Sequence, residues 1–396
     1  MKFTPPILII FILLISGCNF PRQPQPKALS NAIKSAQPGQ SSQPKSDTKE
    51  AKLIAVGDIL MHMALTRSGY NPQKKTYNFD HFFKEVKPII SQGDWAIANL
   101  ETPVAGAELG YSEFPLFNAP AQIVDAAKKT GFNILTTANN HALDKGEKGV
   151  INTIKNLRSR GVALVGTASS AQEAEKILIV NKNNISMAIL AYTFSTNGIP
   201  IPQGKNYLVS LIDENKIVKD IARARKQGAD IVTICLHFGD EYQRQPNARQ
   251  KQLVQRLIAA GADIILGNHP HVVQPYQIFK VRGKDGKLRT RVAIYSLGNF
   301  IAYQLGNYKD IGVIFSVKIR KRFPEKTVEI TQVEAIPTYT QNYRLNNQLN
   351  FRVLPIEAVV NRQKDPLIPA SKYPVLKRQL VEMKRHLKSM KEIRDR

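Results

Sequence analysis

Short apolar runs alternate with helical patterns through most of this chain, and that alternation constrains the fold more than any other feature. The apolar runs lie at 53–57, 95–100, 132–138, 162–166, 186–192, 230–239 and 262–271, and the helical patterns at 79–90, 120–130, 146–160, 218–227 and 250–260. Strands that alternate with helices typically build a sheet with helices on its faces. We therefore predict an α/β domain, to which strand-like runs at 311–319 and 328–336 add antiparallel pairs.

Residues that can bind metals follow five of these apolar runs. They comprise two carboxylates, one amide and four imidazoles: Asp58, Glu101, Asn140, His141, His237, His269 and His271. Open α/β sheets gather their sites at the strand ends, so we expect these side chains to meet. Carboxylate and amide oxygens suit hard divalent ions, and imidazole suits Mn, Fe or Zn. No serine or cysteine lies in a nucleophile-elbow motif, so the pattern indicates hydrolysis assisted by two divalent metal ions.

Single residues of this set also have structural interpretations. Asp58 could cap a helix, Asn140 could form a turn, and His237 could be a hydrogen-bonded core residue. His269 and His271 are harder to explain in that way, because two histidines one residue apart can point at one site from a loop.

The first fifty residues indicate export rather than a folded structure. Lys2 precedes a nearly pure apolar run at 7–15, and two small residues then lead to Cys18. We interpret 1–17 as a lipoprotein signal peptide and Cys18 as the lipidated residue; the alternative is an ordinary signal peptide with a chance cysteine. Residues 18–50 are rich in Pro, Gln, Ser and Lys, which predicts a flexible tether. We therefore expect the protein at the extracytoplasmic face of the cell membrane, held there by lipid.

The net charge of +25 indicates contact with a polyanion or an anionic membrane; the alternative is a lysine-rich surface without a specific partner. Nucleic acid is not expected, because the leader indicates export and no nucleic-acid-binding motif is present. A C-terminal extension, 343–396, contains a helical stripe among basic residues: Leu376, Leu380, Met383, Leu387 and Met390. We expect this helix to pack on its own domain; a partner helix and a basic membrane-surface helix are the alternatives.

Six short strings of the sequence resemble the signature blocks of one protein family. They are VGDIL, NLETP, ANNHALDKG, LHFGDEY, GNHPHVVQP and YSLGNF, and they cover roughly residues 52–302. The blocks resemble those of the CapA family of poly-γ-glutamate capsule-biosynthesis proteins, which is similar to the calcineurin-like metallophosphoesterases. The resemblance implies a four-layer αββα sandwich, placed at 51–342, with a two-metal site at the strand ends.

The resemblance also implies a role for each candidate residue. The positions that match metal ligands are Asp58, Glu101, Asn140, His237, His269 and His271, with Glu101 near the place of a bridging aspartate; His141 matches the catalytic histidine. Three positions depart from the superfamily pattern. Leu60 replaces the histidine of the opening D-x-H motif, for which His62 could substitute as a ligand. A glutamate replaces the bridging aspartate, and Ala142 replaces the acidic residue after His141, although Asp144 follows.

Two hypotheses about function remain at this point. The first is a metal-dependent hydrolase that acts on a phosphoester or an anionic polymer during poly-γ-glutamate or capsule assembly and export. Arg244 and Asn299 are its weaker candidates for substrate binding, although Asn299 could simply form a turn. The second is a non-catalytic accessory lipoprotein that holds a polyanion or a capsule synthase partner. Leu60 and the basic charge favour the second hypothesis. The retained Asn140, His141 and the pair His269 and His271 favour the first.

Overall fold

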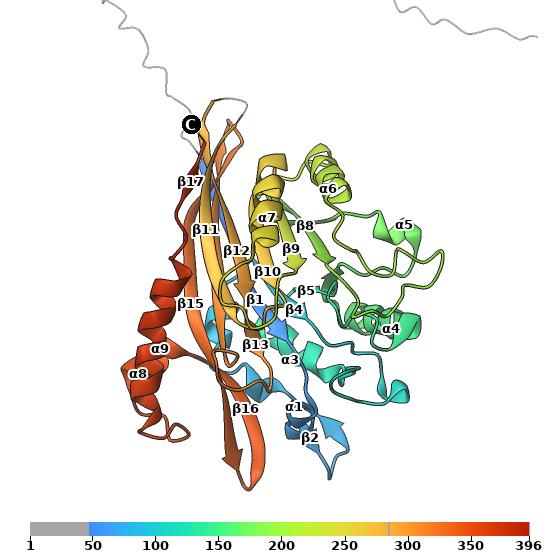
Figure 1. Ribbon diagram of the computed structural model, residues 1–396, viewed down its shortest axis with the longest axis vertical. Coiled ribbons are helices and arrows are strands. Elements are labelled where there is room, and N and C mark those ends of the chain that lie inside the picture. Colours follow the sequence, from blue (N-terminus) through green and yellow to red (C-terminus); the bar gives the residue numbers. More distant parts are fainter. Residues whose placement is uncertain (1–46, 284–285, 396) are drawn as a thin grey trace, which may run out of the picture. The chain divides into compact units, whose positions relative to one another are not determined.

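The computed structural model describes residues 47–283 and 286–395, and in this part of the chain two sheets lie face to face between helices (Figure 1). The predicted αββα sandwich is thus confirmed. The expected signal peptide (1–17), the candidate lipidation site Cys18 and the tether up to residue 46 lie outside the described residues. Within the described residues, no helix is long and apolar enough to cross a membrane.

Two large sheets contain most of the described strands. The first has the order β16-β15-β14-β1-β4-β5-β6, with β13 also paired to β1; the second has the order β17-β11-β12-β10-β9-β8-β7. The strands of the first are β1 (Asp47–Ile59), β4 (Trp95–Leu100), β5 (Ile134–Thr136), β6 (Ala163–Val165), β13 (Asn299–Ile301), β14 (Ile311–Phe323), β15 (Thr327–Leu345) and β16 (Gln348–Pro355). Those of the second are β7 (Leu178–Lys182), β8 (Ile185–Thr193), β9 (Ile231–His237), β10 (Ile264–Asn268), β11 (Val273–Arg282), β12 (Leu288–Leu297) and β17 (Ile393–Arg394). Two short strands, β2 (Tyr70–Asn71) and β3 (Thr76–Tyr77), pair with each other.

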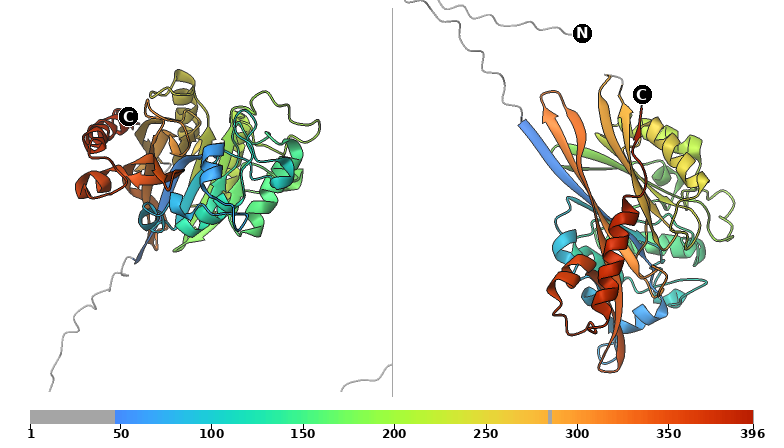
Figure 2. Two further views of the ribbon diagram at one scale, coloured as in Figure 1. Left: turned by 90° about the horizontal axis from the view of Figure 1, so that it is seen from below. Right: turned by 60° about the vertical axis from the view of Figure 1, so that its left-hand side comes forward.

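The helices cover the outer faces of both sheets. The first sheet is covered by α1 (Met63–Ser68), the 3₁₀ turn η1 (Asp80–Phe82), α2 (Lys87–Ile90), α3 (Gln122–Thr130) and α4 (Gly146–Ser159). The second is covered by α6 (Glu214–Lys226) and α7 (Ala248–Ala260). Two C-terminal helices, α8 (Ile356–Arg362) and α9 (Lys372–Leu387), contribute to the core between the sheets and contact β11 and β15 (Figure 2). The short elements η2 (Ala107–Leu109) and α5 (Ala171–Ala174) lie in connections.

Strand β1 shows why the apolar runs of the sequence are continuous. Leu53 and Ala55 belong to the core between the two sheets, whereas Ile54 and Val56 pack against the helices outside the first sheet. A strand buried on both faces has no solvent side, so its sequence has no polar alternation. Each fully buried aliphatic side chain stabilises the fold by about 1.5–3 kcal/mol.

Three expected boundaries differ from the structure. The expected tether, 18–50, ends too late, because β1 already begins at Asp47 in antiparallel pairing with Phe323. The expected extension, 343–396, begins inside β15, and β16 then pairs along β15 as the edge of the first sheet. The expected helix at 79–90 is two short pieces, η1 and α2. Pro88 lies in the first turn of α2, where its missing N–H is tolerated.

The apolar stripe of the C-terminal helix is buried in its own domain. Leu376, Leu380, Met383 and Leu387 of α9 all lie in the core between the sheets. Met390, just beyond the helix, packs on the residues outside the second sheet. The apolar stripe is therefore buried against its own domain, as predicted.

Gly57 leaves room for a crossing of the chain between the two sheets, next to the candidate metal ligand Asp58. The backbone crosses from β12 to β13 at Gly298, whose φ of 68° favours glycine, and Gly298 O accepts from Asp58 N at 3.0 Å. A Cβ at Gly57 would lie 1.7 Å from Gly298 O, so the two backbones touch.

We expect Gly57→Ala to destabilise the protein by roughly 3 kcal/mol, at the upper end for overpacking, because two backbones would have to separate. Chemical denaturation of the purified protein measures this change. Gly110→Ala is the matched control: no atom lies within 4 Å of its Cβ, and only its φ of 67° opposes alanine. Its cost should be about 1–2 kcal/mol. Equal losses in the two variants would contradict the close approach at Gly57.

Candidate metal centre

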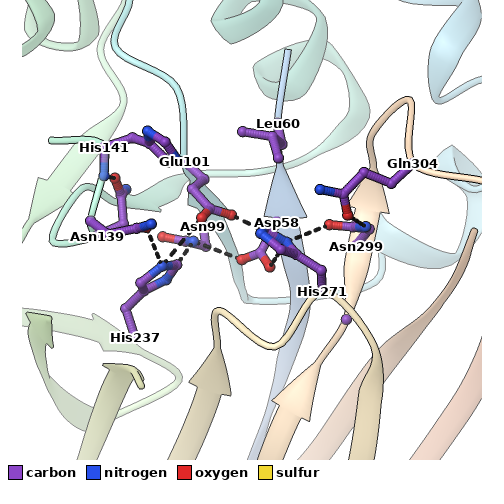
Figure 3. Close-up of polar contacts among 12 residues, drawn as sticks. Asp58, Leu60, Asn99, Glu101, Asn139, His141, His237, His271, Asn299 and Gln304 are labelled. Atoms are coloured by element: carbon purple, nitrogen blue, oxygen red, sulfur yellow. Dashed lines mark hydrogen bonds and ion pairs between the residues drawn. The ribbon is translucent and has the colours of Figure 1, made fainter. Parts of the chain in front are cut away.

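The candidate ligands converge from both sheets at the ends of their parallel strands (Figure 3). Asp58 lies on β1, and Glu101 directly follows β4. His237 ends β9, and His269 directly follows β10. The first sheet thus supplies the carboxylates, and the second sheet supplies imidazoles. The close-up view shows Glu101 between His237 on one side and Asp58 and His271 on the other.

Two groups of three buried ligands share Glu101. One group is Glu101, His237 and His269; the other is Asp58, Glu101 and His271. Within each group the ligand atoms lie within 4.8 Å of one another. Glu101 Oε1 lies 3.3 Å from His237 Nε2, and Glu101 Oε2 lies 3.8 Å from His271 Nδ1. Glu101 could therefore serve as a ligand in both groups, one oxygen facing each.

Several buried polar atoms at this point have no hydrogen-bond partner within the described residues. They include both carboxylate oxygens of Glu101, His269 Nδ1 and Asn268 Oδ1. An unsatisfied buried acceptor costs about 1–3 kcal/mol, and more when it is charged. Cations bound between these atoms would remove that cost. The donor set therefore fits divalent ions, with carboxylate oxygen and imidazole nitrogen as the available ligand atoms.

Burial sets the protonation of this group. Burial, together with the nearby Asp58 charge, raises the pKa of Glu101 to about 8. Burial lowers the pKa of His237 to about 3 and that of His269 to about 2, so both imidazoles are neutral and able to bind a metal. Burial alone would also lower the pKa of His271, but Glu101 and Asp58 outweigh it and raise that pKa to about 9. Without a cation, the cluster retains protons to balance its buried carboxylates.

The His269-Pro270-His271 turn has strained backbone. His269 has a φ of 98° and His271 a φ of 59°, both in the left-handed region that disfavours side chains. Such conformations cost about 1–3 kcal/mol each and gather at functional sites. The strain brings two imidazoles from one loop to two different ligand groups, which a purely structural role does not require.

Two asparagines support the ligands. Asn140 Oδ1 lies 2.7 Å from His237 Nε2, so Asn140, the asparagine that the resemblance makes a metal ligand, lies next to the first group. Asn99 Nδ2 donates to Asp58 Oδ1 at 2.8 Å and lies 3.3 Å from His237 Nδ1. Thr136 Oγ1 in turn donates to Asn99 Oδ1 at 2.9 Å. Sequence reasoning assigned no role to Asn99; the available signal was its position at a strand end beside Asp58.

His141 forms a pair with Asp144. Its Nδ1 lies 2.8 Å from Asp144 Oδ2, which also accepts from the backbone N–H of Phe117 at 2.7 Å. The backbone N–H of His141 donates to Asn139 Oδ1 at 3.1 Å. Asp144 thus supplies, three residues later, the acidic partner that is missing at Ala142. This pairing fixes the imidazole and leaves Nε2 for chemistry.

The structure does not bring His62 into either ligand group. Its Nδ1 lies 3.2 Å from both the backbone N of Tyr303 and the carbonyl oxygen of Leu60, and its ring packs against Phe117. Leu60, at the expected histidine position, is buried in a small apolar cluster with Phe117 and Ala302. The suggested substitution of His62 for the missing D-x-H histidine therefore has no support in the geometry.

The two weaker candidates for substrate binding both have structural partners. The guanidinium of Arg244 pairs with Glu382 Oε1 on α9 at 2.6 Å and lies over the Tyr308 ring, 3.7 Å from its centroid. Arg244 therefore contacts Glu382 and Tyr308 instead of the ligand groups. Asn299 Oδ1 lies 3.0 Å from His271 Nδ1, so Asn299 orients a candidate ligand instead of forming only a turn.

Cys235 is not a nucleophile candidate. It is buried, and burial raises its pKa to about 12, so the reactive thiolate does not form.

Comparison with known proteins gives both family and structural relatives. Residues 52–304 match the family described as "Bacterial capsule synthesis protein PGA_cap". The chain is 30% identical over 264 residues to "Capsule biosynthesis protein CapA" of Bacillus anthracis, covering 64% of this chain and 60% of that protein. It is 31% identical over 270 residues to "PGA biosynthesis protein CapA" of Bacillus subtilis (strain 168), covering 66% and 67%. Among solved structures, the calcineurin-like phosphoesterase YfkN from Bacillus subtilis gives a TM-score of 0.46 at 14% identity, covering 74% of this chain and 91% of that one.

Proposed function

Because this chain belongs to the PGA_cap family of bacterial capsule synthesis proteins, we propose that it is a metal-dependent phosphoesterase or other hydrolase acting in the assembly or export of an anionic capsule polymer. The observation that carries the proposal is the pair of buried ligand groups sharing Glu101, with His141 and Asp144 beside them. The substrate is a phosphoester or a bond in an anionic surface polymer such as poly-γ-glutamate.

Each residue has a defined part in the proposed reaction. Asp58, Glu101 and His271 would hold one ion, and Glu101, His237 and His269 the other. When bound, the ions would polarise the phosphoryl oxygens and activate water. His141 would donate a proton to the leaving oxygen through Nε2, while Asp144 holds Nδ1 and stabilises the charged imidazole.

One observation favours a second function, in which the same fold holds a polymer or a capsule synthase partner without catalysis. Leu60 places an apolar side chain where a ligand would complete the site, and His62 does not replace it. The group that contains Asp58 therefore has one ligand fewer than the superfamily pattern implies. The His141–Asp144 pair favours the enzyme, because an imidazole held by a carboxylate is suited to proton transfer, which a scaffold does not need.

Metal analysis of the purified protein, beside hydrolysis of a generic phosphodiester and monoester, tests the proposal. We expect two equivalents of Mn, Fe or Zn and measurable hydrolysis of at least one substrate. Absence of bound metal after loading with each ion would exclude the phosphoesterase. Bound metal with no hydrolysis of either ester would favour the scaffold.

We also propose that the protein is anchored to the extracytoplasmic face of the cell membrane through lipid on Cys18. The support is the sequence alone: an apolar run at 7–15 and small residues directly before the cysteine. We expect Cys18→Ser to move the protein from the membrane fraction to the soluble extracytoplasmic fraction, as immunoblots of cell fractions would record. Unchanged membrane attachment in this variant would rule out the anchor.

A further inference from the structure

A basic and an acidic side chain fasten helix α9 to two loops of the candidate metal centre. Arg244 lies on the loop after β9, seven residues beyond the ligand His237, and its Nη1 donates to Glu382 Oε1 at 2.6 Å. The other oxygen of Glu382 accepts from the hydroxyl of Tyr308, on the loop between β13 and β14. Arg244 also stacks on the Tyr308 ring. One carboxylate of α9 therefore holds both loops together.

The loop that carries Tyr308 reaches the ligand His271 through two hydrogen bonds. Lys309, the next residue, presents its backbone carbonyl to Asn299 Nδ2 at 2.8 Å. Asn299 Oδ1 lies 3.0 Å from His271 Nδ1. The position of Tyr308 thus fixes the carbonyl that fixes Asn299, and Asn299 orients the imidazole.

A second route from α9 reaches the other side of the same ligand. His386 Nε2 lies 2.9 Å from the carbonyl oxygen of Val273, two residues after His271. The loop after β9 adds Tyr242, whose ring centroid lies 6.1 Å from that of His271. Within the ranges that the structure describes, no comparable hydrogen bond joins α9 to His237 or His269. The hydrogen bonds that lead from α9 through Asn299 and Val273 thus end at or beside His271, and the loop after β9 reaches the same turn through Tyr242 N, which donates to Pro270 O at 2.8 Å.

We infer that α9 is a positioning element for the ion held by Asp58, Glu101 and His271, and that Glu382 is the residue through which it acts. The inference rests on the proposed two-metal centre. It concerns a helix at 372–387, outside the matched region 52–304. The physical reason is that His271 has a strained backbone with φ of 59°, so its position depends on contacts that hold the loop. Residues behind metal ligands typically change metal affinity by about 10–100-fold.

The test is a Mn²⁺ titration of the purified full chain by isothermal titration calorimetry, with wild type, Glu382→Ala and Glu382→Gln. We expect Glu382→Ala to weaken one of the two sites by roughly 10-fold and to leave the other unchanged. Glutamine can still accept from Arg244 and contact Tyr308, so Glu382→Gln should retain most of the affinity. In a His271→Ala background, Glu382→Ala should cause no further loss, because the supported ligand is already absent.

Lys384→Ala provides the matched control from the same helix. Lys384 pairs with Glu357 on α8 at 2.7 Å, and both side chains are exposed. This variant should bind Mn²⁺ as wild type does, and the melting temperatures of both alanine variants without metal show whether folding has changed. Unchanged affinity at both sites in Glu382→Ala would overturn the inference, and so would an equal loss at both. Failure of the wild type to bind any ion would instead refute the metal centre itself.

Discussion

Replacing Glu101 with alanine is expected to reduce bound metal from two ions to one or none and to lower phosphoester hydrolysis by at least about 10²–10³-fold. Glu101 is the only residue common to both ligand groups found in the described part of the chain, so its loss removes a ligand from each. It also removes the buried charge that would hold the two cations close to each other. Elemental analysis and steady-state kinetics on the same preparation measure both effects.

Two further variants sharpen this result. Glu101→Gln retains the shape of the side chain but not its charge, and should also lose metal if bridging by a carboxylate is the cause. Glu357→Gln, on the exposed surface of α8, should behave as wild type in both measurements. Full metal content in Glu101→Ala would mean that the shared carboxylate does not bind the ions.

The second large effect concerns His141. We expect His141→Ala to retain nearly normal metal content, because His141 belongs to neither ligand group. Hydrolysis should nevertheless fall by roughly 10²–10⁴-fold, the usual loss for a positioned acid–base group. Asp144→Asn should give a smaller loss of hydrolysis, since the amide can still contact Nδ1 but no longer stabilises a charged imidazole. Asp58→Ala should differ from both and lose metal together with activity.

The same variant separates the enzyme from the scaffold in cells. A deletion strain that is complemented with wild type or with His141→Ala would be compared for capsule output. The enzyme predicts reduced output with the variant, whereas the scaffold predicts equal output. Normal capsule from His141→Ala would exclude the hydrolase even if the protein binds metal.

The positions of the ligands in sequence could be predicted because strand ends are local features. Asp58 and His237 each lie where an apolar run stops, and parallel strands place their ends together. The prediction that two sheets pack face to face came instead from the family resemblance. Nothing in the alternation of strands and helices states whether one sheet or two will form.

The errors share a physical cause, which is contact between residues far apart in the chain. Arg244 suits phosphate, but its partner Glu382 is 138 positions away and could not be anticipated from local spacing. His62 lies close to the expected position in sequence, yet its Nδ1 lies against the backbone N of Tyr303, 241 residues later, and outside both ligand groups. The start of β1 at Asp47 depends likewise on β14. Tertiary pairing decided each of these outcomes, and local propensity did not.

Each sheet supplies only part of the ligand set, so bound cations would link the two sheets to each other. Asp58 and Glu101 come from the first sheet and its loops, and His237, His269 and His271 from the second. Ions that bind only the assembled pair stabilise the folded chain by mass action, in proportion to the logarithm of their free concentration. The stability of such a sandwich would then rise and fall with the concentration of free transition-metal ions around it.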